Sequence, residues 1–290
     1  MRTQGAPDRH PGLSDILDEL VAEAGQVVEL DDDLFHRPPL DRRLDGPHTL
    51  RAQYATFLES LACARWAEIH LAPPSLVAFF SMGLFPALVH AGSLSLPQGL
   101  EIMTEVAQRS DRLGGGKPFR LGMVMGPTHA EVEAALTPGS SLEVTVAYGR
   151  RVSLVAGLED EVEPFLEKML AAGAPNVRSL PVSAPFHSHA LNGGREELRA
   201  LVAPLDVRSP RVPVLSSSTA DFLRSEEALR QELAENISTP IRWTATMDRM
   251  VREGVSLVVE CGFSREMGDL LDRDFPGACQ VKRFVAKESK

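Results

Sequence analysis

The sequence predicts a mixed α/β protein, in which a core with a parallel sheet is interrupted by a small ferredoxin-like subdomain of order βαββαβ. Helix-like and strand-like apolar patterns alternate along most of the 290 residues. The segment Val255–Glu260 is a continuous apolar run, which is typical of a strand covered on both faces in a parallel sheet. Between residues 119 and 182 the elements become short and closely spaced, as in a ferredoxin-like unit.

The predicted core is split along the chain. Its first part, within residues 1–115, has apolar residues at helical spacing, interrupted by one short buried strand before Ser81. The expected helices are 13–24, 49–70, 84–91 and 97–113, and the expected strand is 75–80. Its second part, within residues 183–290, continues the alternation. The expected helices are 190–205, 226–235 and 244–253, and the expected strands are 212–216 and 255–260.

Residues 116–182 form the predicted small subdomain, which follows a hinge-like break at 114–118. Its expected strands are 119–125, 142–147, 152–156 and 177–182, and its expected helices are 128–136 and 158–172. The glycines of the break are followed by Lys117 and Pro118 and lack the spacing of a phosphate-binding loop. We therefore expect a hinge there and no nucleotide site.

Composition restricts the class of partner and the compartment. Thirty Lys and Arg residues stand against forty Asp and Glu residues, a net charge of −10, which argues against nucleic acid or an anionic membrane. An acidic partner would have to meet a local basic patch. We interpret Arg150–Arg151 as a solvated turn, which is also a candidate for such a patch. Three widely spaced cysteines form no disulfide or zinc pattern, so we expect a cytoplasmic protein without a metal. No segment approaches the length of a membrane span.

Ser81 is the first candidate for chemistry, because it follows a buried strand at the point where the chain turns into a helix. This placement matches a nucleophile elbow, usually G-x-S-x-G, which exposes the serine oxygen and presents the next backbone N–H to an oxyanion. Gly83 supplies the second glycine, whereas Phe79 replaces the first. The alternative is an ordinary serine that caps a helix. Pro86 has no N–H, so the helix must start late or be distorted.

His187 is the candidate base. It follows the last predicted strand of the small subdomain, where the chain re-enters the core and a cleft between lobes is plausible. A serine becomes nucleophilic near neutral pH only with a base in hydrogen-bonding reach. The alternative is a loop histidine with its hydrogen bonds satisfied. A metal bound by His187 and His189 is disfavoured, because no companion ligands accompany them.

Together these segments resemble the malonyl-CoA:acyl carrier protein transacylase family. FFSMGLFPALVHAG (79–92) is similar to its GHSLGE-type elbow, LPVSAPFHS (180–188) to its histidine segment, and STPIRWTATMDRMVREGVSLVVECG (238–262) to its closing stretch. The resemblance covers roughly residues 10–285. It implies an α/β-hydrolase-like core with an inserted ferredoxin-like subdomain.

The resemblance also implies a Ser–His pair that works by a ping-pong route. Ser81 would take the acyl group from a thioester, and His187 would remove the serine proton and later that of the incoming thiol. The Met82 N–H would donate to the oxyanion, and the backbone carbonyl of Asn236 would orient His187. No cofactor is implied; acyl-CoA or a phosphopantetheinyl carrier protein is the substrate.

Two departures from the family pattern change what we expect. The family begins with a strand and a GQGS loop that donates a second N–H to the oxyanion. We expect no strand there, and Gln4-Gly5-Ala6 is only weakly similar to the GQGS loop. Loss of one oxyanion donor lowers the rate by about 10²–10³. The family arginine that holds the malonyl carboxylate falls on Val106, or on Arg109 only with a three-residue insertion. A valine cannot pair a carboxylate, so we predict a neutral acyl group.

The pocket is predicted to be apolar and bulky. Phe80 replaces the histidine of the elbow, and Tyr148 replaces an asparagine of the family; Phe186 lies beside His187. We predict an acyltransferase of fatty acid or polyketide-type biosynthesis, with an acyl carrier protein as its partner and a polyketide synthase or a coenzyme A thioester as further candidates. Two alternatives stay open: an acyl thioester hydrolase, and a catalytically degenerate protein that only binds a carrier or synthase.

Overall fold

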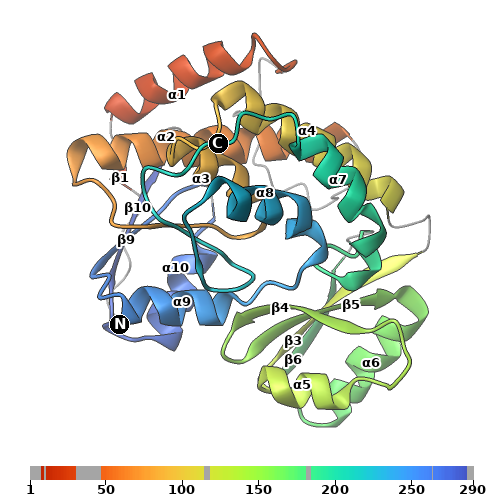
Figure 1. Cartoon of the computed structure of the whole chain (residues 1–290). Helices are drawn as coiled ribbons and strands as arrows, with labels where there is room; N and C mark the ends of the chain where they lie inside the picture. Colours follow the sequence, from red (N-terminus) through yellow and green to blue (C-terminus); the bar gives the residue numbers. More distant parts are fainter. Residues whose placement is uncertain are drawn as a thin grey trace.

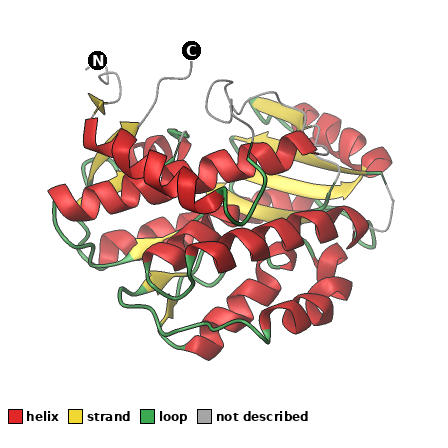
Figure 2. Cartoon of the chain, turned by 90° about the horizontal axis from the view of Figure 1, so that it is seen from above, coloured by secondary structure: helices red, strands yellow, loops and turns green. Residues whose placement is uncertain are grey.

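The computed structural model describes residues 8–9, 11–30, 47–113, 118–180, 184–262 and 264–285. In it the chain forms a larger, helix-rich lobe and a smaller lobe that contains one antiparallel sheet (Figure 1). In the view from above, the long strands of the small lobe lie to one side of the helices of the large lobe (Figure 2). The predicted hinge and both predicted subdomain boundaries fall in or beside residues 114–117 and 181–183, which lie outside the described residues, so the boundaries stay predictions.

The large lobe is built around the helices α1 and α2. Helix α1 (Pro11–Ala24) buries Leu13, Leu17 and Leu20, whose spacing places them on one helical face. That face packs against α2 (Pro47–His70), the longest helix in the described part of the chain. Both helices agree with the sequence prediction to within two residues.

The remaining helices of the large lobe follow in two groups. Before the small lobe come α3 and α4; after it come α7 to α10. Their bounds are Leu84–His90 for α3, Leu96–Leu113 for α4, Arg195–Val202 for α7, Glu226–Glu235 for α8, Trp243–Arg252 for α9 and Glu266–Asp274 for α10. The helix predicted over 190–205 is corrected: residues His189–Gly194 form a 3-10 helix (η2) before α7, because Gly193 and Gly194 disfavour an α-helix.

The strands of the large lobe form two three-stranded sheets. One has the order β1-β10-β9, with Asp8–Arg9, Gln280–Val285 and Leu257–Glu260, and both of its strand pairs are parallel. The other has the order β2-β7-β8, with Val77–Ala78, Val214–Leu215 and Phe222–Leu223. In it β2 and β7 are parallel, whereas β7 and β8 are antiparallel. The predicted parallel core is confirmed, although β2 and β7 are shorter than expected.

Two expectations about these strands are wrong. We expected no strand before the first helix, but Asp8 and Arg9 pair in parallel with Phe284 and Val285 of β10. A two-residue strand carries no periodicity, so only its partner reveals it. We also expected β9 to be covered on both faces, but Leu257 is 37% exposed and the next two residues are half-buried.

The small lobe has the predicted ferredoxin-like arrangement. Its elements are β3 (Phe119–Met125), α5 (His129–Ala135), β4 (Glu143–Gly149), β5 (Val152–Leu158), α6 (Glu159–Ala171) and β6 (Asn176–Leu180). The sheet order is β4-β5-β3-β6, with all neighbours antiparallel. Side chains from α5, α6 and the sheet form a separate apolar core. Strand β4 also reaches the large lobe, because Val146 forms a parallel bridge with Ile241.

Candidate active site

Ser81 occupies the turn between β2 and α3, as the elbow prediction requires. Its φ is +52°, a left-handed conformation that non-glycine residues adopt at a cost of about 1 kcal/mol or more. The residues Ser81–Gly83 form a 3-10 turn (η1), closed by a hydrogen bond from the Gly83 N–H to the Phe80 carbonyl at 2.9 Å. This turn leaves the Ser81 side chain half-buried at the end of the strand.

Pro86 is accommodated by the late start of the helix, as predicted. Helix α3 begins at Leu84, so Pro86 is its third residue. The first N–H groups of an α-helix have no partner within the helix, and the missing donor therefore costs no hydrogen bond.

His187 is held at a second strained position. Its φ is +62°, and its backbone N–H donates to the carbonyl of Ile237 at 2.6 Å. The side chain is 5% exposed. The carbonyl belongs to η3 (Asn236–Ser238), a buried 3-10 turn that directly follows α8. The histidine is thus fixed to a segment about fifty residues away in the sequence.

The structure brings Ser81 and His187 into contact. Ser81 Oγ lies 2.8 Å from His187 Nε2, and His187 Nδ1 lies 2.9 Å from the backbone oxygen of Asn236. A carbonyl can only accept, so Nδ1 carries the hydrogen and Nε2 is free to accept the serine proton. Burial lowers the pKa of His187 to about 4, although hydrogen bonds to backbone groups of Asn236 and Thr239 oppose this shift. The imidazole is therefore neutral at pH 7, the form that a general base needs.

The backbone N–H of Met82 is the predicted oxyanion donor. It has no hydrogen-bond partner among the described residues, and Met82 is half-buried directly after Ser81. A free N–H next to the nucleophile is the geometry that stabilises a tetrahedral oxyanion. The other expected donor region, Gln4-Gly5-Ala6, lies outside the described residues.

An aromatic cluster lies beside the serine. The Phe80 ring makes edge contacts with Tyr148 at 5.3 Å and with Trp243 at 5.5 Å between ring centroids. The Tyr148 hydroxyl donates to Glu266 Oε2 at 2.5 Å. Burial, the largest cause, and this hydrogen bond raise the pKa of Tyr148 above its usual range. Sequence reasoning named Phe80 and Tyr148 but missed Trp243, whose only signal was its place in the closing segment of the resemblance.

The two other predicted pocket residues lie at the main core. Val106 is 5% exposed and belongs to the large apolar core, against which Met82 and Phe186 pack. Phe186 also contacts a small apolar cluster around Leu121 of β3. The roles of these residues in holding a substrate stay predictions.

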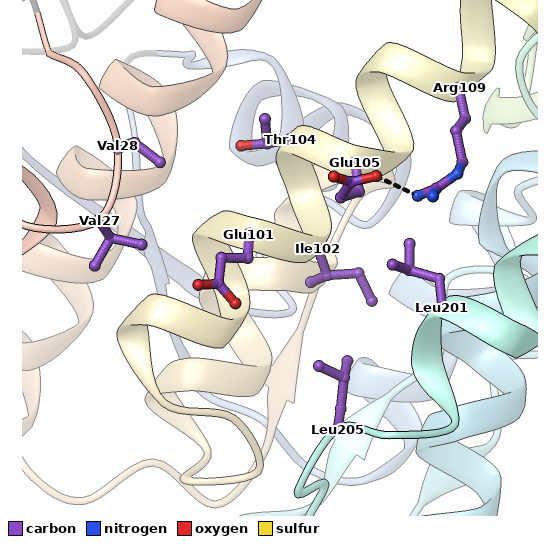
Figure 3. A pocket seen from close by; sticks show the side chains of 9 residues that line it. All are labelled: Val27, Val28, Glu101, Ile102, Thr104, Glu105, Arg109, Leu201 and Leu205. Carbon is purple, nitrogen blue, oxygen red and sulfur yellow. Dashed lines mark hydrogen bonds and ion pairs between the residues drawn. The ribbon is translucent and has the colours of Figure 1, made fainter.

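Arg109 is engaged away from the dyad. Its guanidinium bonds Glu105 at 2.5 Å on its own helix and Glu197 at 2.7 Å on α7. It borders a pocket of about 430 Å³ that lies between α4, the end of α7 and the residues after α1, and that contains neither Ser81 nor His187 (Figure 3). The position of Arg109 therefore gives no support to the three-residue insertion that would align it with the family arginine.

The candidate basic patch at the β4–β5 turn is partly occupied by contacts within the chain. The Arg150 guanidinium lies over the Phe275 ring at 4.6 Å, and Arg151 donates to the carbonyl of Gly126 at 2.7 Å. In the part of the chain that the structure describes, no three His, Cys, Asp or Glu side chains gather as metal ligands would. No described helix is both long and apolar enough to cross a bilayer.

A serine and a histidine in contact at a strand–helix turn of an α/β fold form the arrangement that enzymes use to make an acyl-serine intermediate. No protein-family model matches the chain. The polyketide biosynthesis protein ThaF of Burkholderia thailandensis is 28% identical over 221 residues, which are 76% of this chain and 19% of ThaF. The chain thus matches only a small part of that relative. The malonyl CoA-acyl carrier protein transacylase of Bacillus subtilis strain 168 is 25% identical over 232 residues, 78% of this chain and 72% of the relative.

Solved structures show the same likeness. An acyl-carrier-protein S-malonyltransferase from Burkholderia pseudomallei is 25% identical with a TM-score of 0.86, over 99% of this chain and 95% of the other. A malonyl-transacylase in complex with its type II polyketide synthase acyl carrier protein has the same TM-score of 0.86 at 23% identity, over 99% of this chain and 95% of the other. The predicted resemblance is confirmed: in sequence and in fold, the chain is similar at modest identity to malonyl-CoA:acyl carrier protein transacylases.

Proposed function

We propose that the protein is an acyltransferase that moves an acyl group between thioesters, one of them on an acyl carrier protein, in fatty acid or polyketide-type biosynthesis. The observation that carries the proposal is the chain of contacts from Ser81 Oγ through His187 to the Asn236 carbonyl, at 2.8 and 2.9 Å. The names of the relatives, transacylases that act on acyl carrier protein, support the substrate class. We propose the cytoplasm as its location, because all three thiols are free.

The first half-reaction loads the serine. Ser81 Oγ attacks the thioester carbonyl carbon while His187 Nε2 takes the serine proton, and the Met82 N–H stabilises the oxyanion. The C–S bond then breaks, the acyl group stays on Ser81 as an ester, and the leaving sulfur takes the proton from His187. The second half-reaction runs in reverse with an incoming thiol, so that no cofactor is consumed.

We further propose that the acyl group is neutral. The position matched to the malonyl-binding arginine is Val106, and Arg109 already pairs with Glu105 and Glu197. An anionic acyl group in this apolar surrounding would be buried without a cation, which is costly. The ring of Phe80, packed on Tyr148 and Trp243, supports an apolar wall for the acyl chain.

The test is acylation measured by intact mass. The protein is incubated with acetyl, longer-chain and malonyl thioesters of coenzyme A, and an adduct is expected from the neutral donors. Ser81→Ala should lose the adduct, whereas Ser179→Ala, which changes an exposed serine of the small lobe, should keep it. Transfer is then followed as the mass gain of an added phosphopantetheinyl carrier protein.

Each other outcome has a definite meaning. No adduct from any donor would reject the enzyme and favour a protein that only binds a carrier or a synthase. An adduct from malonyl alone would reject the argument from Val106. An adduct that forms but is released to water faster than to the carrier thiol would identify a hydrolase.

A further inference from the structure

A carboxyl group is buried near the turn that contacts the histidine, and no Lys or Arg among the described residues pairs with it. Glu232 of α8 is 8% exposed. Its Oε2 accepts a hydrogen bond from Ser216 Oγ at 2.9 Å, and its Oε1 accepts one from Ser218 Oγ at 3.5 Å. Burying a carboxyl group among hydroxyl groups is costly, and an apolar side chain on the same helix face as Leu229 and Leu233 would avoid that cost.

Glu232 lies one helical turn before Asn236, the residue whose carbonyl faces His187. The Asn236 amide is close enough to stabilise the charged carboxylate, although its buried Nδ2 does not reach hydrogen-bonding geometry. Burial raises the pKa of Glu232, and the contacts with Ser216, Asn236 and Ser218 oppose that rise. The carboxyl group thus lies near Asn236, at the beginning of η3, and the Glu232 backbone carbonyl accepts a hydrogen bond from the Asn236 N–H.

The other partner of Glu232 belongs to the serine side of the site. Ser216 directly follows β7, and β7 pairs in parallel with β2, the strand that leads to Ser81. The Ser216 hydroxyl also accepts from the N–H groups of Ser218 and Thr219 at 3.1 and 3.2 Å, which orients it toward the carboxylate. Glu232 therefore connects the strand layer that carries the nucleophile with the turn that holds the base.

The turn η3 determines where the imidazole lies. Asn236 accepts from the His187 ring and Ile237 from its backbone, so a shift of η3 moves His187 relative to Ser81. On its far side η3 is held by Arg195, which donates to Ser238 Oγ at 2.8 Å and to Thr239 Oγ1 at 3.2 Å. Without the Glu232 side chain, the Ser216 hydroxyl and the Asn236 amide at the beginning of η3 would lose the carboxyl group that lies close to both.

We propose that Glu232 is a positioning residue: through Ser216 and Asn236 it sets the distance between Ser81 and His187. The proposal rests on the proposed acyl transfer for its catalytic meaning, but the geometry it describes can be measured without any thioester. Glu232 does not contact the reacting atoms. Its effect is on the rate of serine attack, and the affinity for the donor should stay unchanged.

The experiment uses two readouts. The first is the second-order rate at which phenylmethylsulfonyl fluoride modifies Ser81, a reaction that forms the Oγ–S bond and releases fluoride as His187 takes the proton. The second is the proton NMR signal of His187 Nδ1–H, assigned by its loss in His187→Gln. The variants are Glu232→Leu, which removes the acceptor, Glu232→Gln, which retains one, and Glu227→Gln, a matched change on the exposed face of α8.

We expect Glu232→Leu to react ~10-fold more slowly, because misplacing reacting groups by a fraction of an ångström to 1 Å costs up to two orders of magnitude. Its Nδ1–H signal should move upfield or vanish. Glu232→Gln should recover most of the rate and the signal, and Glu227→Gln should match the wild type. A folded Glu232→Leu protein with wild-type rate and signal would overturn the proposal, as would a Gln variant no better than the Leu variant.

A second variant decides the matter if Glu232→Leu does not fold. Ser216→Ala removes the hydroxyl that donates to Glu232 and accepts from the N–H groups of Ser218 and Thr219, and we expect a smaller loss of about 3-fold, because the carboxyl group itself stays beside Asn236. Unchanged rate and signal in Ser216→Ala would then reject the proposal. A wild-type protein that is acylated by no thioester rejects the proposed function alone, because the NMR comparison between variants still tests the position of His187.

Discussion

The Nδ1 atom of His187 lies 2.9 Å from the backbone oxygen of Asn236, and this contact decides the protonation of the candidate base. A backbone oxygen offers no proton, so the neutral ring carries its hydrogen on Nδ1 and turns a bare Nε2 toward Ser81 Oγ at 2.8 Å. In a Ser–His–Asp triad a carboxylate performs this task. Here the orienting group is a neutral carbonyl, and burial is the largest influence on the histidine pKa, which it lowers.

The pH dependence of serine modification should reflect this environment. Burial lowers the pKa of His187 from 6.5 to about 4, so the neutral imidazole persists well into the acid range. We expect the rate of Ser81 modification by a sulfonyl fluoride to rise with a midpoint near pH 4 and to be level from about pH 6 upward. His70→Gln, which changes an exposed histidine, should leave the profile unchanged. A midpoint near 6.5 would mean that His187 is hydrated.

The stability of the protein should also depend on this histidine. Its folded pKa lies below its unfolded value, so between pH 6.5 and about 4 the unfolded chain binds a proton that the folded chain does not. The free energy of unfolding should therefore fall as the pH falls through this window, by at most about 3 kcal/mol from this group. Urea denaturation at pH 7 and pH 4.5 measures the loss.

The matched comparison for this effect is His187→Gln. The pKa values of His90 and His129 are also lowered, mainly by burial, and they add to the acid destabilisation of both proteins. Only the difference between wild type and His187→Gln belongs to His187. Equal losses in the two proteins would contradict the assignment.

The positive φ of Ser81 should be visible as strain. Glycine adopts φ of +52° without penalty, so Ser81→Gly should be more stable than Ser81→Ala by about 1 kcal/mol, while both lose the acyl adduct. Ala220 has a φ of +58° outside the dyad, and Ala220→Gly should gain a similar amount with its adduct intact. Chemical denaturation of the wild type and of these three variants measures the free energies of unfolding. Equal stability of the Gly and Ala variants at position 81 would show that the elbow is unstrained.

Truncation of Phe80 should enlarge the acyl range. The ring is half-buried between Tyr148 and Trp243, so Phe80→Ala should destabilise the protein by about 2 kcal/mol and leave space beside the serine. We expect the ratio of adduct from long to short acyl donors to increase. Phe79→Leu serves as a control, because Phe79 is 3% exposed in the main core. An unchanged donor preference would place the acyl chain elsewhere.

Local pattern was sufficient where an element is long and lies in one consistent environment. Strand β3 was predicted with the observed bounds, 119–125, and α8 with 226–235, because apolar alternation and helical spacing persist over their length. Strands β1 and β8 have two residues each, and α10 and β10 were not predicted. Short strands owe their conformation to pairing with a distant segment, which a local pattern does not record.

Some residues of the candidate site could likewise be predicted from local sequence, and others could not. Ser81 and His187 could be named from the motifs around them, because a strand–serine–helix turn and a histidine after a βαββαβ unit are visible in the order of residues. The ion pair of Arg109 could not be predicted from the sequence, because its partner on α7, Glu197, is 88 residues away. Glu232 gave no signal at all, since a glutamate on an amphipathic helix is ordinarily exposed.

By itself the sequence predicted the fold class, the ferredoxin-like insertion and Ser81 and His187 as the candidate pair, since each leaves a pattern within one stretch of chain. Only the tertiary structure decided that Ser81 and His187 touch, which ring nitrogen faces the serine, and that Glu232 is buried against Ser216. These are contacts between β2, η3, α8 and the β7 turn, segments that only packing and strand pairing bring together. The exact separations of these groups depend on the folded backbone, and they cannot be derived from the spacing of residues along the sequence.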